Sequence, residues 1–156
     1  MARTVVAGFG NLLMSDDGVG IHVVRALAAH AHALPDGVEL VDGGVSSLEV
    51  LGSLLDAARI IIVDALAGGG EPGAVYRLTP ADLRTVPAAP GYSLHEFSLP
   101  QTIALLAATA QLPPIVIYGV EPASLAMGLE LSPPATAAAR RVVDLVLADV
   151  RGGADA

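Results

Sequence analysis

Short apolar runs along the chain alternate with turn-forming residues and with segments of helical periodicity. Uninterrupted apolar runs are typical of strands that are buried on both faces of a sheet. They predict strands near residues 4–8, 38–42, 60–64, 74–78 and 115–119. Residues 60–63 are four consecutive β-branched residues, so we expect this strand at the centre of the sheet.

The strand near residues 74–78 differs from the others in its connection. It directly follows the glycine-rich loop 67–73, which leaves no room for the long crossover that parallel neighbours need. We therefore expect this strand to be antiparallel and to lie at an edge of the sheet. The following segment, residues 79–90, carries three prolines and is expected to be mostly irregular.

Capping residues predict where the helices begin. Ser15 or Asp16 is placed to cap a first helix that continues to about Ala33, because a short side-chain oxygen accepts free N–H groups. In the second helix, Leu48, Leu51 and Leu55 are expected on the apolar stripe. Capping boxes or a Ser-Pro pair open the second and later helices, at Ser46 to Glu49, Ser98 to Gln101 and Ser132-Pro133.

Together these elements predict an α/β fold. We expect a single three-layer domain over residues 1–150, with helices on both faces of a five-stranded twisted sheet. The sheet should be mostly parallel, with one antiparallel edge strand. Residues 151–156 are expected to form a disordered tail.

Composition narrows the functional classes. Although 53% of the 156 residues are hydrophobic, no apolar run approaches the ~18 residues of a membrane span, and Asn11 and Asp16 interrupt the first run too early for a secretory signal. A net charge of −8 argues against nucleic acid and anionic membranes. Without cysteine, any metal must be held by oxygen and imidazole nitrogen. We expect a cytoplasmic monomer that binds neither nucleic acid nor a membrane.

Carboxylates follow three of the predicted parallel strands, at the sheet edge where open α/β sheets bind their ligands. Asp16 and Asp17 come after a turn at residues 8–10, Asp42 ends the second strand, and Asp64 ends the central strand. A phosphate site needs a positive helix start, so two carboxylates there favour a cation instead. A carboxylate after a buried strand, as at Asp64, is costly unless it is paired or metal-bound.

A structural interpretation stays open for two of these aspartates. Asp16 can simply cap the helix, and Asp42, before two glycines, can form a turn with its own backbone. His95 lies in a long loop that can reach the same edge, whereas His22 and the other two histidines are expected on the surface. Two carboxylates and an imidazole fit a divalent-metal site, and ligand type does not distinguish Zn, Mn, Fe and Ni. These residues alone make the chain a candidate metallohydrolase.

The chain resembles the maturation endopeptidases of nickel–iron hydrogenases in an ordered series of motifs. The first motif, residues 8–20, reads Gly-Phe-Gly-Asn-Leu-Leu-Met-Ser-Asp-Asp-Gly-Val-Gly. Each motif is weak alone, but the ordered set is specific and covers nearly the whole chain. The others are Asp42-Gly43-Gly44, Ile62-Val63-Asp64-Ala65, the loop around His95, Gly119-Val120-Glu121-Pro122 and Gly128-Leu129-Glu130-Leu131-Ser132-Pro133.

This resemblance implies an aspartyl-type peptide hydrolase that removes a C-terminal extension from the hydrogenase large-subunit precursor after nickel insertion. Matched by motif, Asp17, Asp64 and His95 contact the metal, which is carried by the substrate rather than permanently bound. Asp42 matches an aspartate with a suspected catalytic part. Our hypothesis is that a water attacks the peptide bond, either polarised by nickel or deprotonated by Asp42 or Asp16.

Two alternatives to this function stay open. One is an independent metallohydrolase with a resident divalent metal, which would turn over generic substrates. The other is a non-catalytic nickel-sensing chaperone on the same scaffold, which would bind the precursor without cleaving it.

Overall fold

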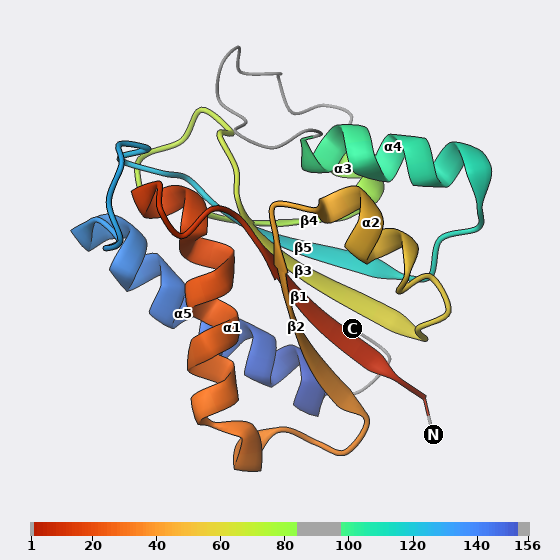
Figure 1. The fold of residues 1–156 in the computed structure, drawn as a ribbon. Coiled ribbons are helices and arrows are strands. Elements are labelled where there is room, and N and C mark those ends of the chain that lie inside the picture. Colours follow the sequence, from red (N-terminus) through yellow and green to blue (C-terminus); the bar gives the residue numbers. More distant parts are fainter. Residues whose placement is uncertain (1, 84–97, 153–156) are drawn as a thin grey trace.

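A central sheet lies between two layers of helices in the structure, a computed structural model that describes residues 2–83 and 98–152 (Figure 1). The elements in chain order are β1 (Thr4–Phe9), the 3₁₀ turn η1 (Ser15–Gly18), α1 (Val19–Ala29), the 3₁₀ turn η2 (Ala31–Ala33), β2 (Val38–Gly44), α2 (Ser47–Gly52), β3 (Arg59–Ala65), β4 (Val75–Leu78), α3 (Pro80–Leu83), α4 (Leu99–Thr109), β5 (Ile115–Val120) and α5 (Pro133–Arg151).

The sheet has the predicted number of strands and the predicted strand directions. Its strand order is β2-β1-β3-β5-β4. Strands β2, β1, β3 and β5 pair in parallel, and β4 pairs antiparallel with β5 at the edge. All seven residues of the central strand β3 are buried. The prediction of a mostly parallel sheet with one antiparallel edge strand is therefore confirmed.

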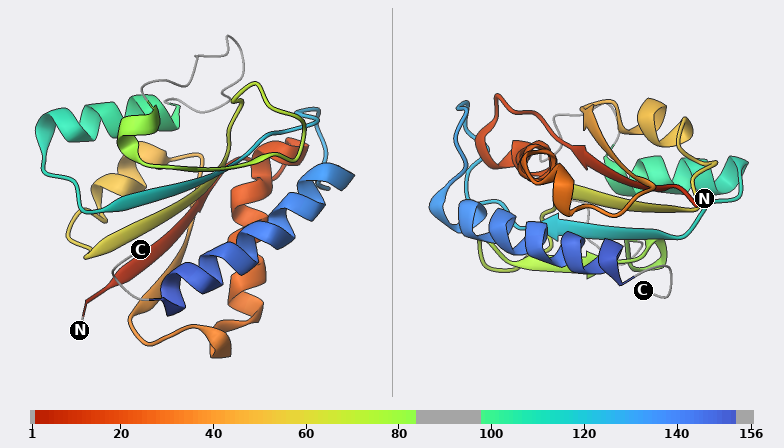
Figure 2. Two further views of the ribbon diagram at one scale, coloured as in Figure 1. Left: turned by 180° about the vertical axis from the view of Figure 1, so that it is seen from behind. Right: turned by 90° about the horizontal axis from the view of Figure 1, so that it is seen from below.

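Alternate strand residues face two different helix layers. Val5, Ala7 and Phe9 of β1 belong to the core under α2 and α4. Val6 of β1 belongs instead to the core shared with α1 and α5. Figure 2 shows these two layers on opposite faces of the sheet. Because both faces are covered, the parallel strands read as continuous apolar runs rather than as alternating ones.

The turn after β1 depends on close backbone contact. Gly10 has φ +138°, and a Cβ at this position would lie 1.9 Å from the Asp17 carbonyl oxygen. A Cβ on Gly20, at the start of α1, would lie 2.3 Å from the Val63 oxygen. Only glycine fits at such positions. These contacts bring η1 and the first turn of α1 directly onto the ends of β1 and β3.

Several predicted helix details are wrong. Neither Ser15 nor Asp16 caps α1, whose N-cap is Gly18 without a side-chain bond, and α1 ends at Ala29. The capping box from Ser46 does not form. The buried leucine after α2 is Leu54 and not Leu55, because this six-residue helix ends before the apolar periodicity can continue.

Other helix details follow the prediction. The capping box from Ser98 to Gln101 is present, and Ser132 caps α5 with proline in the first turn. One further departure is the one-turn helix α3, Pro80–Leu83, inside the segment that was expected to be mostly irregular. Among the described helices, none combines the length and the apolar character that crossing a membrane requires.

A buried polar cluster joins α5 to the sheet. The Asp149 carboxylate accepts hydrogen bonds from Arg59 at 3.0 Å and from Arg77 at 3.4 Å. The Tyr118 hydroxyl donates to the other oxygen of the Asp149 carboxylate. Burial alone would raise the pKa of Asp149, but these hydrogen bonds and the two guanidinium charges hold it below its ordinary value.

Candidate functional site

Asp17 and Asp64 are two buried carboxylates on neighbouring segments at the carboxyl edge of the sheet. Asp17 lies in η1, which packs against β3, and Asp64 is near the end of β3. Their exposed fractions are 2% and 5%. Asp17 Oδ2 accepts from the Asn11 amide at 2.9 Å, and Asp64 Oδ1 accepts from the Ala65 amide at 2.8 Å. The edge therefore holds both carboxylates in fixed orientations.

Asp42 stands apart from this pair. In the sheet register it lies opposite Gly8 of β1, and Gly8 lies opposite Val63 of β3. With β1 in between, Asp42 is separated from β3 by two strand spacings, roughly 10 Å. Its carboxylate is exposed and accepts from the Gly44 amide at 3.1 Å, which is the turn that an aspartate before two glycines predicts.

Asp16 is fully buried and joins two distant parts of the chain. Oδ2 accepts from the amides of Ala123 and Ser124 at 2.8 and 3.0 Å and from the Ser132 hydroxyl at 2.7 Å. Oδ1 accepts from the Ser132 amide at 2.7 Å. Burial alone would raise the pKa of Asp16, but these hydrogen bonds outweigh it and lower the pKa below its ordinary value. These contacts give Asp16 a structural role in connecting the loops.

Backbone contacts extend this connection between the loop after β1 and the β5–α5 loop, residues 121–132. The Ser15 amide donates to the Gly128 oxygen, and the Gly128 amide donates to the Leu13 oxygen, both at 2.8 Å. Ser15 takes a φ of +50°, unusual for a residue with a side chain, and its hydroxyl donates to the Ala126 oxygen at 2.6 Å. Local sequence carries no signal of this pairing, because its partners are more than 100 residues apart.

Glu121 fixes a third loop at the same edge. Its Oε1 accepts from the amides of Gly68 and Gly70 at 2.9 and 3.0 Å and from the Tyr76 hydroxyl at 2.7 Å. The side chain is buried. The resemblance placed Glu121 in a motif without assigning a role, and the contacts show that it holds the glycine-rich loop 67–73 against β5.

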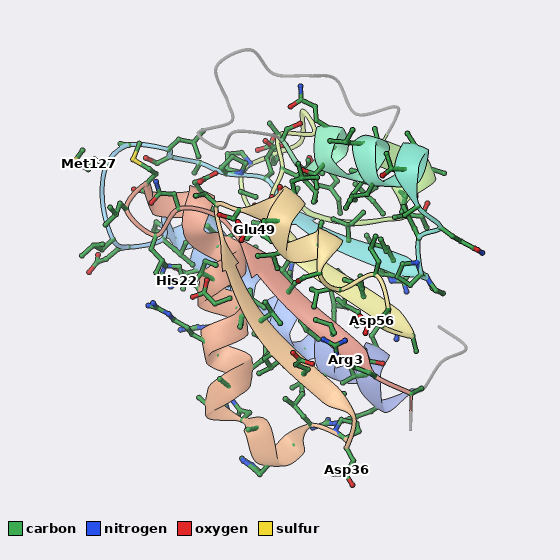
Figure 3. All side chains as sticks on the ribbon, turned by 45° about the vertical axis from the view of Figure 1, so that its right-hand side comes forward. Arg3, His22, Asp36, Glu49, Asp56 and Met127 are labelled. Carbon is green, nitrogen blue, oxygen red and sulfur yellow. The ribbon has the colours of Figure 1, made fainter. Side chains whose placement is uncertain are left out.

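Among the described histidines, His22 differs from its predicted place, whereas His30 and His32 are exposed as predicted. His22 is half-buried on α1 rather than on the surface (Figure 3), and burial and the nearby Arg25 lower its pKa against the opposing effect of Asp16. His95 lies outside the described residues, so its predicted position at the edge stays a prediction. Within residues 2–83 and 98–152, no three His, Asp or Glu side chains form a metal-ligand cluster.

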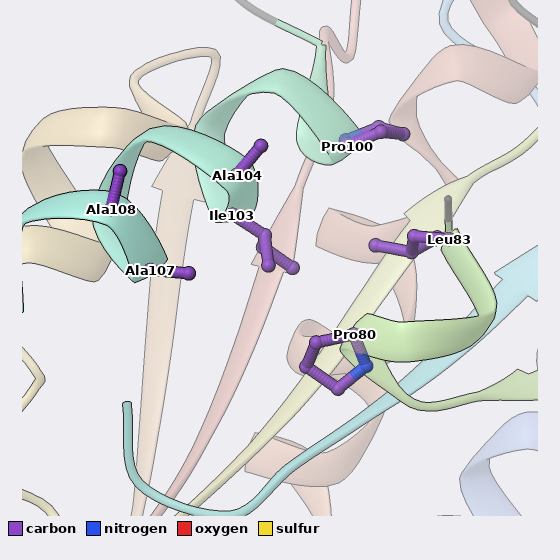
Figure 4. Close-up of a pocket in the computed structure, with 7 residues that line it drawn as sticks. All are labelled: Pro80, Leu83, Pro100, Ile103, Ala104, Ala107 and Ala108. Carbon is purple, nitrogen blue, oxygen red and sulfur yellow. The ribbon is translucent and has the colours of Figure 1, made fainter. Parts of the chain in front are cut away.

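A separate cavity of about 430 Å³ lies between α3 and α4 (Figure 4). Pro80 and Leu83 line one side, and Pro100, Ile103 and three alanines of α4 line the other. This lining offers apolar contact but no acid, base or nucleophile. The acidic residues that the sequence singled out lie instead at the carboxyl edge of the sheet, away from this lining.

The five-stranded, mostly parallel sheet with helices on both faces is a fold that the chain shares with solved peptide hydrolases. The sequence model described as hydrogenase maturation protease matches residues 21–149. The chain therefore belongs to the hydrogenase maturation protease family and is a peptide hydrolase.

Particular relatives support this assignment along the chain. The chain is 33% identical to the hydrogenase 2 maturation protease of Escherichia coli over 153 residues, which cover 96% of this chain and 91% of that protein. It is 37% identical over 110 residues to the hydrogenase expression/formation protein HupD of Rhodobacter capsulatus, covering 70% of this chain and half of that protein.

Solved structures show the same fold. The hydrogenase-maturating endopeptidase HybD from Escherichia coli superimposes with a TM-score of 0.79 at 31% identity, covering 96% of this chain and 93% of that one. The hydrogenase 2 maturation peptidase from a Thaumarchaeota archaeon gives a TM-score of 0.69 at 32% identity, covering 94% and 97%. The predicted family, fold class and enzyme class are thus confirmed.

Proposed function

We propose that this protease removes the C-terminal extension from the nickel-loaded precursor of a nickel–iron hydrogenase large subunit. The observation that carries the proposal is that two buried carboxylates, Asp17 and Asp64, lie on two elements in contact, η1 and β3, at the sheet edge of a hydrogenase maturation protease. Carboxylate oxygens bind divalent metals, so this pair suits a metal ion presented by the substrate. His95 is the third ligand in the proposal, on the strength of the resemblance.

In this proposal, Asp17 and Asp64 position the scissile peptide bond by docking the substrate's nickel. Holding the reacting groups in a fixed geometry removes much of the entropic cost of their encounter. The two carboxylates are already fixed by amide hydrogen bonds from Asn11 and Ala65. Little further ordering is then needed when the substrate binds.

Of the two candidate general bases, the contacts favour Asp42. Asp16 receives four hydrogen bonds and has a lowered pKa, so it is a poor proton acceptor. Asp42 is exposed and receives one described hydrogen bond, from Gly44. Because β1 separates it from β3, Asp42 would act on a water beside the nickel-docking pair rather than as a further ligand.

The test is to mix the purified protein with the large-subunit precursor, with and without loaded nickel, and to measure the intact mass of the precursor. We expect loss of a C-terminal peptide only from the nickel-loaded form. Asp64→Asn should abolish this cleavage, whereas the control Asp36→Asn, exposed at the far end of the molecule (Figure 3), should cleave normally.

The other outcomes separate the alternatives. Cleavage without nickel would overturn docking on the substrate's metal and support a protease with a resident metal. Binding of the precursor with no change in mass would support the non-catalytic chaperone. Full activity of the Asp64→Asn variant would show that cleavage does not require the carboxylate pair.

A further inference from the structure

Three large apolar side chains stand exposed beside the candidate site. The exposed fractions of Leu13, Met127 and Leu129 are 60%, 86% and 66%. We propose that these three residues, the apolar ridge, form the docking surface for an apolar segment of the precursor polypeptide near the bond that is cleaved. This inference rests on the proposed function and adds where the polypeptide binds.

The apolar ridge is held in place by the buried polar contacts beneath it. Met127 and Leu129 flank Gly128, whose amide donates to the Leu13 oxygen at 2.8 Å. The Asp16 carboxylate fixes both ends of the same loop through Ala123 and Ser132. Apolar side chains that are exposed to solvent on a loop do not stabilise the folded monomer by burial. When their backbone is already held in place, they can bind a partner with little loss of conformational entropy.

The position of the apolar ridge connects it to the carboxylate pair. Leu13 and Asp17 belong to the same short segment after β1, and η1 packs on β3, which carries Asp64. Figures 1 and 2 show the loop after β1 and the β5–α5 loop together at this edge, and Met127 lies at the outer margin in Figure 3. A substrate whose metal reaches Asp17 and Asp64 would pass over the apolar ridge.

Charge and area favour the precursor over a second copy of this chain. Two copies of this chain would each carry a formal net charge of −8, and meeting through this face would bring the exposed Glu130 of each copy together. Three side chains also expose much less than the ~800 Å² per partner that a stable complex of standard size buries. A nickel-bearing precursor instead offers a cation for the carboxylates and needs only a small, transient contact.

The experiment compares the double variant Met127→Ser/Leu129→Ser with the wild type on nickel-loaded precursor at several precursor concentrations. Removing contacts made equally in the ground and transition states raises KM and leaves kcat unchanged. We expect KM to rise on the order of tenfold, as for loss of central apolar contacts in an interface. The matched control, Leu105→Ser/Leu145→Ser, removes two exposed leucines from α4 and α5 and should change neither constant.

Other results would overturn the apolar ridge as a docking surface. The docking surface would be refuted if the double variant had an unchanged KM, or if only its kcat fell. If the wild type binds the precursor without cleaving it, the proposed function fails while the docking surface is still tested. In that case the dissociation constant of the double variant for nickel-loaded precursor should rise by the same factor, and an unchanged constant would refute the proposal.

Discussion

Asp16 and Asp149 are both buried aspartates, yet the protein holds them in opposite ways. Asp149 accepts hydrogen bonds from a tyrosine hydroxyl and from two arginines, and the positive charges of the arginines offset its own. Asp16 is held by backbone amides and one hydroxyl, which are neutral donors. Burial raises the pKa of each, and hydrogen bonds from neutral groups lower it below its ordinary value in both cases; only at Asp149 do the hydrogen bond and the positive charges of arginines lower the pKa further.

This difference fits the function that we propose for the edge around Asp16. Neutral donors stabilise the Asp16 carboxylate without cancelling its charge, which suits the docking of a cation that we propose at this edge. The arginines beside Asp149 instead offset the charge of a carboxylate that joins α5 to β3, β4 and β5. A buried acid can therefore be satisfied either by dipoles or by countercharges, and this protein uses both.

The largest expected effect comes from removing Asp149. Asp149→Ala leaves Arg59 buried without its partner, and breaking a buried ion pair in this way costs about 3–5 kcal/mol. Urea unfolding should show this loss, while the exposed control Asp144→Ala on the same helix should stay within about 0.5 kcal/mol of the wild type. A loss below 1 kcal/mol would mean that the cluster contributes little to stability.

A smaller loss is expected for Asp16→Asn. The amide keeps the shape of the side chain, but its NH₂ group must then face at least one of the four donors, so one hydrogen bond to a charged acceptor is replaced by a clash. Loss of such a bond costs about 1.5–3 kcal/mol. Amide exchange at Ser124 and Ser132 should accelerate, and cleavage should fall because the loops loosen. Unchanged exchange would show that the backbone pairing at Gly128 holds the loops without Asp16.

The comparison also shows which features the sequence can reveal. Strand β3 was predicted because its four consecutive β-branched residues are a local property that burial on both faces requires. The Ser98 capping box was predicted for the same reason, since its partner Gln101 is three residues away. Glycine at positions 8 and 10 likewise signalled the turn that brings η1 onto the sheet.

What could not be predicted depends on contacts between distant residues. Asp16 looked like a cap for the helix that follows it, whereas its partners lie 107 to 116 residues away in sequence. The position of Asp42 depends on strand order, because β1 between β2 and β3 separates it from Asp64. His95 lies outside the described residues, so its part in the site stays a prediction.

Lowering the pH should reduce the contribution of both Asp16 and Asp149 to the free energy of unfolding, because the pKa of each is lower in the folded state. A carboxylate whose pKa is lower in the folded state stabilises the fold above its unfolded pKa, about 3.9, and loses this contribution as the pH falls through the folded value. Unfolding free energies measured from pH 6 to pH 3 should therefore decrease in the wild type. The decrease should be smaller in Asp16→Asn, because Asn does not titrate, and identical slopes would contradict the lowered pKa of Asp16.

The smallest expected effect is at Arg77, which tests whether both arginines matter to Asp149. The Arg77 side chain is 48% exposed and lies 3.4 Å from the carboxylate, whereas that of Arg59 is 8% exposed and lies at 3.0 Å. Water screens an exposed pair, so Arg77→Met should cost no more than about 1 kcal/mol. Arg59→Met should cost clearly more, because the screened guanidinium of Arg77 is then the only described positive charge in contact with the buried Asp149 carboxylate. Equal losses in urea unfolding would show that Arg77 carries as much of the countercharge as Arg59, and that burial of the pair does not decide its strength here.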